Sequence, residues 1–208
     1  VWTIAFAQTK LLRDPVAGIL HLLIFWGFVL FLFAVVEAII QGFYSPFNLL
    51  FTGPFYAVIT VIQDLFGILV IASVLVSLYR RFVIKVPRLM VDTAGRIDAL
   101  VILLMIMFVC ITMFGQNISL VAINNFVLHE NEVRPVSAFL SNLFFNTDSN
   151  SAPILFEIFW WSHIIIVFAF LNFLPFSKHL HVLSSIPNTF FANNDEIRNR
   201  SMEVAKIT

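Results

Sequence analysis

Three histidines near the end of the chain have the types and spacing expected of cofactor ligands: His163, His179 and His181. They lie on or just after an apolar run. His163 and His181 are 18 positions apart, so at about 100° per residue both project from one face of a regular helix, roughly 27 Å apart along its axis. Imidazoles in lipid are rare and usually functional, and axial ligation of haem is the leading role. The alternative is a polar contact inside the membrane for His163 and interfacial positions for the other two.

Composition indicates an integral membrane protein. The 208 residues are 60% hydrophobic and only 12% charged, whereas soluble domains average about 25% charged. The formal net charge is zero, so the composition does not indicate the basic surface typical of nucleic-acid-binding proteins. The single cysteine, Cys110, lies in an apolar run, so these residues contain no disulfide framework, cysteine-based zinc site or iron–sulfur motif.

Four apolar runs are long enough to span a bilayer. They cover residues 15–40, 55–78, 97–114 and 154–174. This pattern predicts an all-α fold, an integral membrane four-helix bundle. A further apolar stretch, residues 136–145, predicts a short helix lying in the interface between the third and fourth runs.

Basic residues predict the orientation. Every Lys and Arg except Arg134 precedes the first run, lies between the second and third, or follows the fourth. The positive-inside rule makes that side cytoplasmic, so both ends of the chain are expected at the cytoplasmic face of the inner membrane. We therefore expect an interfacial segment at 1–14, a transmembrane domain at 15–181 and a cytoplasmic linker toward a soluble part at 182–208.

Depth along the helices pairs two of the histidines. His21 lies about six residues into the first run, and His181 lies just beyond the fourth, on the same predicted side. Two imidazoles at matching depth on two helices are what bis-histidine haem ligation requires. Gly18, one turn before His21, removes a side chain where a porphyrin face can approach. The alternative for His21 is a helix-end imidazole bonded to a carbonyl.

The outer half of the bundle contains a second candidate pair. His163 and Asp64 each lie about ten residues, or roughly 15 Å, from the outer ends of their runs, so they are predicted to share a level. A carboxylate this deep is costly and should face the bundle and a partner. Glu37 and Glu157 lie near the outer interface, where solvent can reach them.

Two segments carry a family resemblance. Phe173–His181 (FLPFSKHLH), followed by Pro187, resembles the last helix of the respiratory nitrate reductase gamma subunit family, and Gly18–Phe28 (GILHLLIFWGF) resembles that family's first haem-bearing helix. The similarity is closer to the membrane domain of heterodisulfide reductase-related iron–sulfur proteins. In that branch a b-type cytochrome domain precedes a soluble iron–sulfur domain on one chain. The resemblance covers most of the chain.

The resemblance implies a quinone-linked b-type cytochrome. Such a subunit passes electrons between menaquinone or ubiquinone and a cytoplasmic iron–sulfur protein or domain, within a multi-subunit oxidoreductase complex. By position, His21 and His181 match the ligands of the haem iron nearer the cytoplasm, and His163 matches one ligand of an outer haem. His179, two residues before His181, is the competing ligand, and the motif spacing favours His181. The expected partner of His163 is Phe31 in this chain, which cannot ligate, so one haem b is expected and two are the alternative. The family's preceding helix would lie before Val1, making these residues a fragment of a five-helix domain.

Three roles for His163 remain open. With one haem, His163 and Asp64 are predicted to handle quinol, with Asp64 as the catalytic carboxylate, because quinol oxidation releases protons and imidazole takes up a proton near neutral pH. The rivals are ligation of a second haem, with His129 or another group as partner, and a structural hydrogen bond. For the chain as a whole, the alternatives are a haem-free membrane anchor or a proton- or ion-conducting transporter subunit, although the internal symmetry of many transporters is missing.

Overall fold

The computed structural model describes residues 15–44, 46–47, 49–86, 93–124, 132–145, 150–177, 180 and 184. Four of its helices are long: α1 (Pro15–Phe43), α2 (Pro54–Tyr79), α3 (Thr93–Ile123) and α5 (Ala152–Phe173). A π-helical turn, η4 (Arg80–Ile84), extends α2, and the 3-10 turns η3 (Leu49–Thr52) and η6 (Leu174–Phe176) flank α2 and α5. The prediction of an all-α bundle of four long apolar helices is confirmed.

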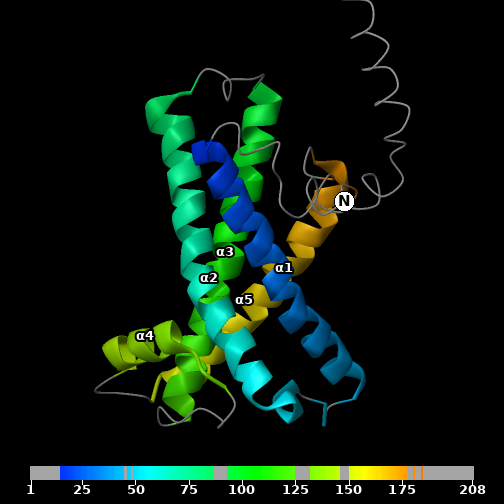
Figure 1. Cartoon of the computed structure of the whole chain (residues 1–208), viewed down its shortest axis with the longest axis vertical. Helices are drawn as coiled ribbons and strands as arrows, with labels where there is room; N and C mark the ends of the chain where they lie inside the picture. The colour runs from blue at the N-terminus through cyan, green and yellow to red at the C-terminus, as the bar shows by residue number, and fades with distance from the viewer. Residues whose placement is uncertain are drawn as a thin grey trace, which may run out of the picture.

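The long helices run alternately up and down (Figure 1). Along the chain, α1 packs on α2, α2 on α3, and α3 on α5. Helices α1 and α5 make few contacts with each other. The start of α1, the end of α2, the start of α3 and the end of α5 lie at one end of the bundle, which we call the basic end because Arg80 and Arg81 are there (Figure 1). The opposite end is called the α4 end.

The short helix α4 (Pro135–Phe145) forms as predicted for residues 136–145. It lies across one end of the bundle rather than along it (Figure 1). It packs on α3 and α2. Its Ser137 and Ser141 are fully buried, whereas Phe139 and Leu143 are about two-thirds exposed. The helix therefore turns small polar side chains toward the protein and large apolar ones outward.

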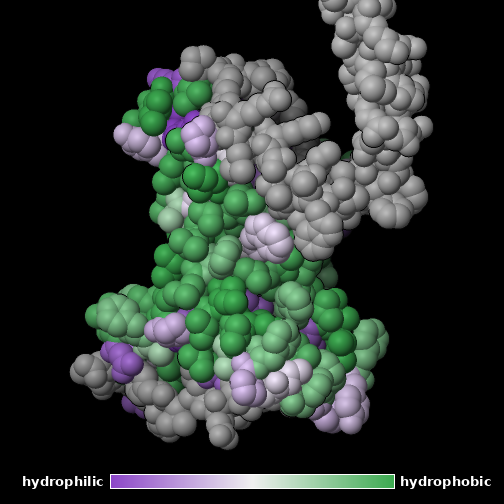
Figure 2. Space-filling view, viewed as in Figure 1, coloured by the Kyte–Doolittle hydropathy of each residue, from purple (hydrophilic) through white to green (hydrophobic). Residues whose placement is uncertain are grey.

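The outer surface of the bundle is apolar. Helices α1, α2 with its π-helical extension, α3 and α5 are each long and apolar enough to cross a membrane. Figure 2 shows apolar residues covering the middle of the visible face, with polar residues toward its two ends. Many large apolar side chains on these helices are exposed, among them Phe33, Phe108 and Phe168. Contiguous apolar surface of this kind suits lipid contact and not water.

Glycines mark the contacts between successive long helices. Each faces one bulky side chain of the neighbouring helix, which a Cβ at that position would overlap: Gly27 faces Val70, Gly67 faces Phe114, and Gly115 faces Phe159. Lipid gives helices little hydrophobic drive to associate, so close approach at small residues contributes much of the packing. The α1–α2, α2–α3 and α3–α5 contacts each use one such glycine.

Candidate functional site

His163 of α5 forms a hydrogen bond with α3. Its Nδ1 lies 2.9 Å from Oγ1 of Thr112. Thr112 is buried, and the His163 side chain is half-buried. His163 is eleven residues past the start of α5 at Ala152, and Thr112 is eleven residues before the end of α3 at Ile123. At about 1.5 Å per residue, both lie roughly 16 Å below the α4 end, deep within the spans.

The Thr112 hydroxyl is also bonded to its own helix. Its Oγ1 lies 2.8 Å from the carbonyl oxygen of Phe108 and 3.1 Å from that of Val109. Threonine hydroxyls in helices commonly donate to the carbonyl one turn back. The imidazole is therefore bonded to a hydroxyl whose orientation is set by the backbone of α3.

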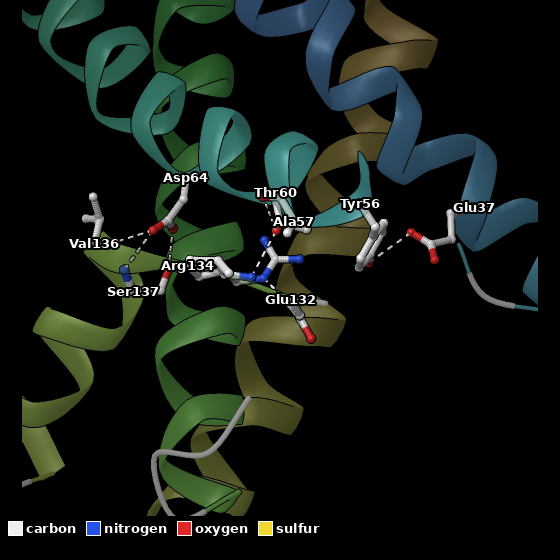
Figure 3. A network of polar contacts seen from close by, with 10 residues as sticks. Glu37, Tyr56, Ala57, Thr60, Asp64, Glu132, Arg134, Val136 and Ser137 are labelled. Atoms are coloured by element: carbon white, nitrogen blue, oxygen red, sulfur yellow. Dashed lines mark hydrogen bonds and ion pairs between the residues drawn. The ribbon is translucent and has the colours of Figure 1, made fainter. Parts of the chain in front are cut away.

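Asp64 of α2 has its partners in a different place, at the start of α4 (Figure 3). The carboxylate is fully buried. One oxygen accepts from the backbone N–H groups of Val136 (2.7 Å) and Ser137 (3.1 Å), and the other accepts from the Ser137 hydroxyl (2.5 Å). These are the first-turn N–H groups that a helix leaves unpaired, and a negative charge is favourable beside them. Asp64 therefore caps α4 from another helix.

Among the described residues, no hydrogen bond joins His163 and Asp64. His163 is bonded to α3, Asp64 is bonded to α4, and α2 and α5 both pack on α3. The depth count from the sequence places two residues at one level, but it does not say on which side of a helix each one projects.

The chain entering α4 is held along the same face of α2. The backbone N–H of Val133 donates to Oγ1 of Thr60 (3.1 Å), which is buried one turn before Asp64. Further along α4, the Ser141 hydroxyl donates to the carbonyl of Ile118 in α3 (2.9 Å). Backbone groups at membrane depth need partners from the protein. Thr60 and Asp64 supply them for the backbone N–H groups of Val133, Val136 and Ser137.

A smaller polar cluster lies beside this segment at the α4 end (Figure 3). Glu37 of α1 accepts from the backbone N–H of Leu49 (2.8 Å) and from the Tyr56 hydroxyl (3.3 Å). Arg134 pairs with Glu132 at 2.6 Å. Glu37 is half-buried, and its bond to Leu49 joins the 3-10 turn η3 to α1. Its carboxylate is therefore stabilised by protein hydrogen bonds as well as by the solvent expected from the sequence. Glu157, in contrast, is exposed.

The predicted haem ligands are only partly within the described residues. His21 is half-buried on α1, one turn after the buried Gly18. His179 and His181 lie outside the described residues, as does His129. Phe31, at the level where a second haem would need a ligand, instead packs against the core formed by Val70, Val74 and Cys110.

In the described part of the chain, no group of three or more His, Cys, Asp or Glu side chains could hold a metal ion. A haem needs only two axial ligands from the protein. One of the predicted pair, His21, lies on α1, which is not in broad contact with α5.

Sequence reasoning missed the hydroxyl residues that hold the two candidates in place, Thr112 for His163 and Ser137 for Asp64. Both lie inside apolar runs, and so do Ser73 and Ser77, whose hydroxyls donate only to carbonyls four residues back in α2. Hydroxyls within apolar runs were therefore a usable signal for polar contacts. The sequence does not say which of them would also meet a distant group.

Two curated proteins are similar to almost the whole chain. The "Probable iron-sulfur-binding oxidoreductase FadF" of Bacillus subtilis (strain 168) is 29% identical over 194 residues, which cover 92% of this chain and 26% of that protein. The "EtfAB:quinone oxidoreductase" of Syntrophomonas wolfei is 28% identical over 203 residues, which cover 94% of this chain and 28% of that protein. The chain thus spans about a quarter of the length of these relatives.

Both relatives are described as oxidoreductases, one binding iron–sulfur and the other linked to quinone. This agrees with the iron–sulfur branch of the resemblance found in the sequence; neither is described as a nitrate reductase gamma subunit. No protein-family model matches the chain. No solved structure matches it either.

Proposed function

We propose that this chain is the membrane part of a quinone-linked oxidoreductase, a haem b-containing electron-transfer domain between the quinone pool and an iron–sulfur partner. The observation that carries the proposal is the similarity of nearly the whole chain to two oxidoreductases, one named for iron–sulfur and one for quinone. Four helices able to cross a membrane support it, because quinones are dissolved in the lipid.

The iron–sulfur partner belongs outside these 208 residues. Clusters are held by several cysteine thiolates, and the chain has only Cys110, buried in α3. We place the partner at the basic end, predicted to be cytoplasmic, and propose residues 182–208 as the linker to it. By the name of the second relative, EtfAB is the candidate for the other redox partner of the whole complex.

His21 and His181 are the proposed axial ligands of one haem b. When bound, the haem supplies a one-electron carrier. The half-buried position of His21, one turn after the buried Gly18, supports this role on α1. A single haem is proposed because Phe31 is part of the packed core and offers no second ligand opposite His163.

Quinol is proposed to bind in the half of the bundle nearer α4, at His163. The hydrogen bonds of Asp64 support a positioning role for that residue, because its carboxylate is already occupied by three donors from α4. In this proposal Asp64 keeps α4 against the bundle, and His163 meets the quinol.

A reduced-minus-oxidised optical spectrum of the purified protein tests the proposal. We expect the α band of a low-spin haem b, lost in His21→Ala and retained in His163→Ala. Membrane insertion of both variants is checked by their presence in washed membranes. Absence of an α band from the wild-type protein would favour the haem-free anchor, and a full α band in His21→Ala would refute the ligand assignment.

A further inference from the structure

We infer that Thr112 fixes His163 in the tautomer that carries its proton on Nδ1, so that Nε2 is presented to the membrane as a lone-pair acceptor for a quinol hydroxyl. The identity of the donor rests on the proposed function. The tautomer rests only on the hydrogen bonds between α3 and α5.

The single hydroxyl proton of Thr112 points to the backbone of its own helix, α3. Its Oγ1 lies 2.8 Å from the Phe108 carbonyl oxygen and 3.1 Å from the Val109 carbonyl oxygen. Carbonyl oxygens only accept, so these contacts are hydrogen bonds only if Thr112 donates to them. If the proton pointed at His163 instead, Oγ1 would face two carbonyl oxygens with lone pairs alone.

The position of the Thr112 proton determines which nitrogen of the His163 ring is protonated. Since the Thr112 proton goes to the backbone, Oγ1 offers a lone pair to Nδ1 of His163 at 2.9 Å, and Nδ1 must donate. A neutral imidazole has one proton, so Nε2 then has a bare lone pair.

Nε2 of His163 is left for a partner from outside the chain's described residues. Within the described ranges, Nδ1 has its hydrogen bond to Thr112, and no hydrogen bond of Nε2 is found. The ring is half-buried and roughly 16 Å from the α4 end of the bundle, where lipid supplies no hydrogen-bond donors. A lipid-soluble quinol brings an O–H group to this depth. A haem iron would use the same lone pair, so the test has to separate these two.

Nuclear magnetic resonance of the full chain, labelled with ¹⁵N-histidine and reconstituted in lipid, tests the tautomer. The His163 signals are assigned by their loss in His163→Asn. We expect a protonated Nδ1 and a bare Nε2 in the wild type and in Thr112→Ser, and loss of that preference in Thr112→Val, which keeps the shape but not the hydroxyl. A proton on Nε2 in the wild type, or an unchanged tautomer in Thr112→Val, would overturn the inference.

A binding measurement with a non-oxidisable menaquinol analogue tests the occupant. We expect Thr112→Val to weaken binding about tenfold, corresponding to one hydrogen bond, with Thr112→Ser near wild type and haem content unchanged in both. Loss of haem from Thr112→Val and His163→Asn would assign the lone pair to iron and overturn the quinol site. If the wild type has no α band at all, the proposed function fails, and the tautomer is still decided by the resonance measurement.

Discussion

Replacing Asp64 by alanine should detach α4 from the bundle. The substitution removes the acceptor for two backbone N–H groups, those of Val136 and Ser137, and for the Ser137 hydroxyl. Ser137 and Asp64 are both fully buried, so water does not readily replace the carboxylate. The variant therefore has to leave these donors unpaired or open the site.

The free-energy cost follows from the number of orphaned donors. A buried donor left without a partner costs about 1–3 kcal/mol, and loss of a helix cap costs about 0.5–2 kcal/mol. The Ser137 hydroxyl can rotate toward another acceptor, so the two N–H groups dominate. We expect Asp64→Ala to destabilise the docked position of α4 by about 3 kcal/mol, and Ser137→Ala, which removes one bond, by about 1 kcal/mol.

Thiol labelling measures this docking directly. Ser141 lies on the buried face of α4, so in a Ser141→Cys variant the new thiol reacts only when α4 lifts away. The parent chain, whose one thiol at Cys110 is buried, gives the background. About 3 kcal/mol corresponds to labelling roughly 100-fold faster when Asp64→Ala is added.

Glu157→Ala is the matched control, because it removes a carboxylate that is exposed on α5. Its labelling rate should equal that of the Ser141→Cys parent. An unchanged labelling rate on adding Asp64→Ala to Ser141→Cys would refute this expectation. The Asp64 carboxylate would then not be the group that holds α4 on the bundle.

Further predictions concern helix contacts and can be followed by thermal melting, with the Cys110 thiol reporting when the bundle opens. Gly115→Ala should lower the free energy of unfolding by about 1–3 kcal/mol, because the new Cβ would overlap the Phe159 ring. In the control, Gly42→Ala, the new Cβ meets nothing within 4 Å, so that variant should be neutral or slightly stabilising. Equal melting temperatures of the two variants would contradict close packing at Gly115. Gln63→Leu should lower the free energy of unfolding by less than about 1.5 kcal/mol. The Leu30 carbonyl, which accepts from Gln63 at 3.0 Å, lies within a helix that already offers it a backbone donor. A larger loss of stability would show that this hydrogen bond is essential to the α1–α2 contact.

The helices were predictable because their signal is local. Long apolar runs between Gly and Pro breaks determined the four spans, and residues 136–145 predicted α4 to within one residue of its start. The partners of Asp64 and His163 were not predictable in the same way. A residue count gives depth along a helix, but the side from which a residue projects depends on helix rotation and on where a distant loop returns. Asp64 meets residues 72 and 73 positions away, and nothing in the pattern around either segment encodes that meeting.

The separation between Asp64 and α4 has a consequence for how the chain is made. Each long helix packs on the one synthesised just before it, so α1, α2, α3 and α5 can associate in the order in which they leave the ribosome. Asp64 and Thr60 of α2 differ, since their donors at Val133, Val136 and Ser137 are made at least 72 residues later. At about 5–20 residues per second, the Asp64 carboxylate waits roughly 4–15 s for these donors. During that interval the nascent α2 has to keep Asp64 near water or hold it against α1 or α3. The final hydrogen bonds of Asp64 are therefore expected to form only once α4 has emerged.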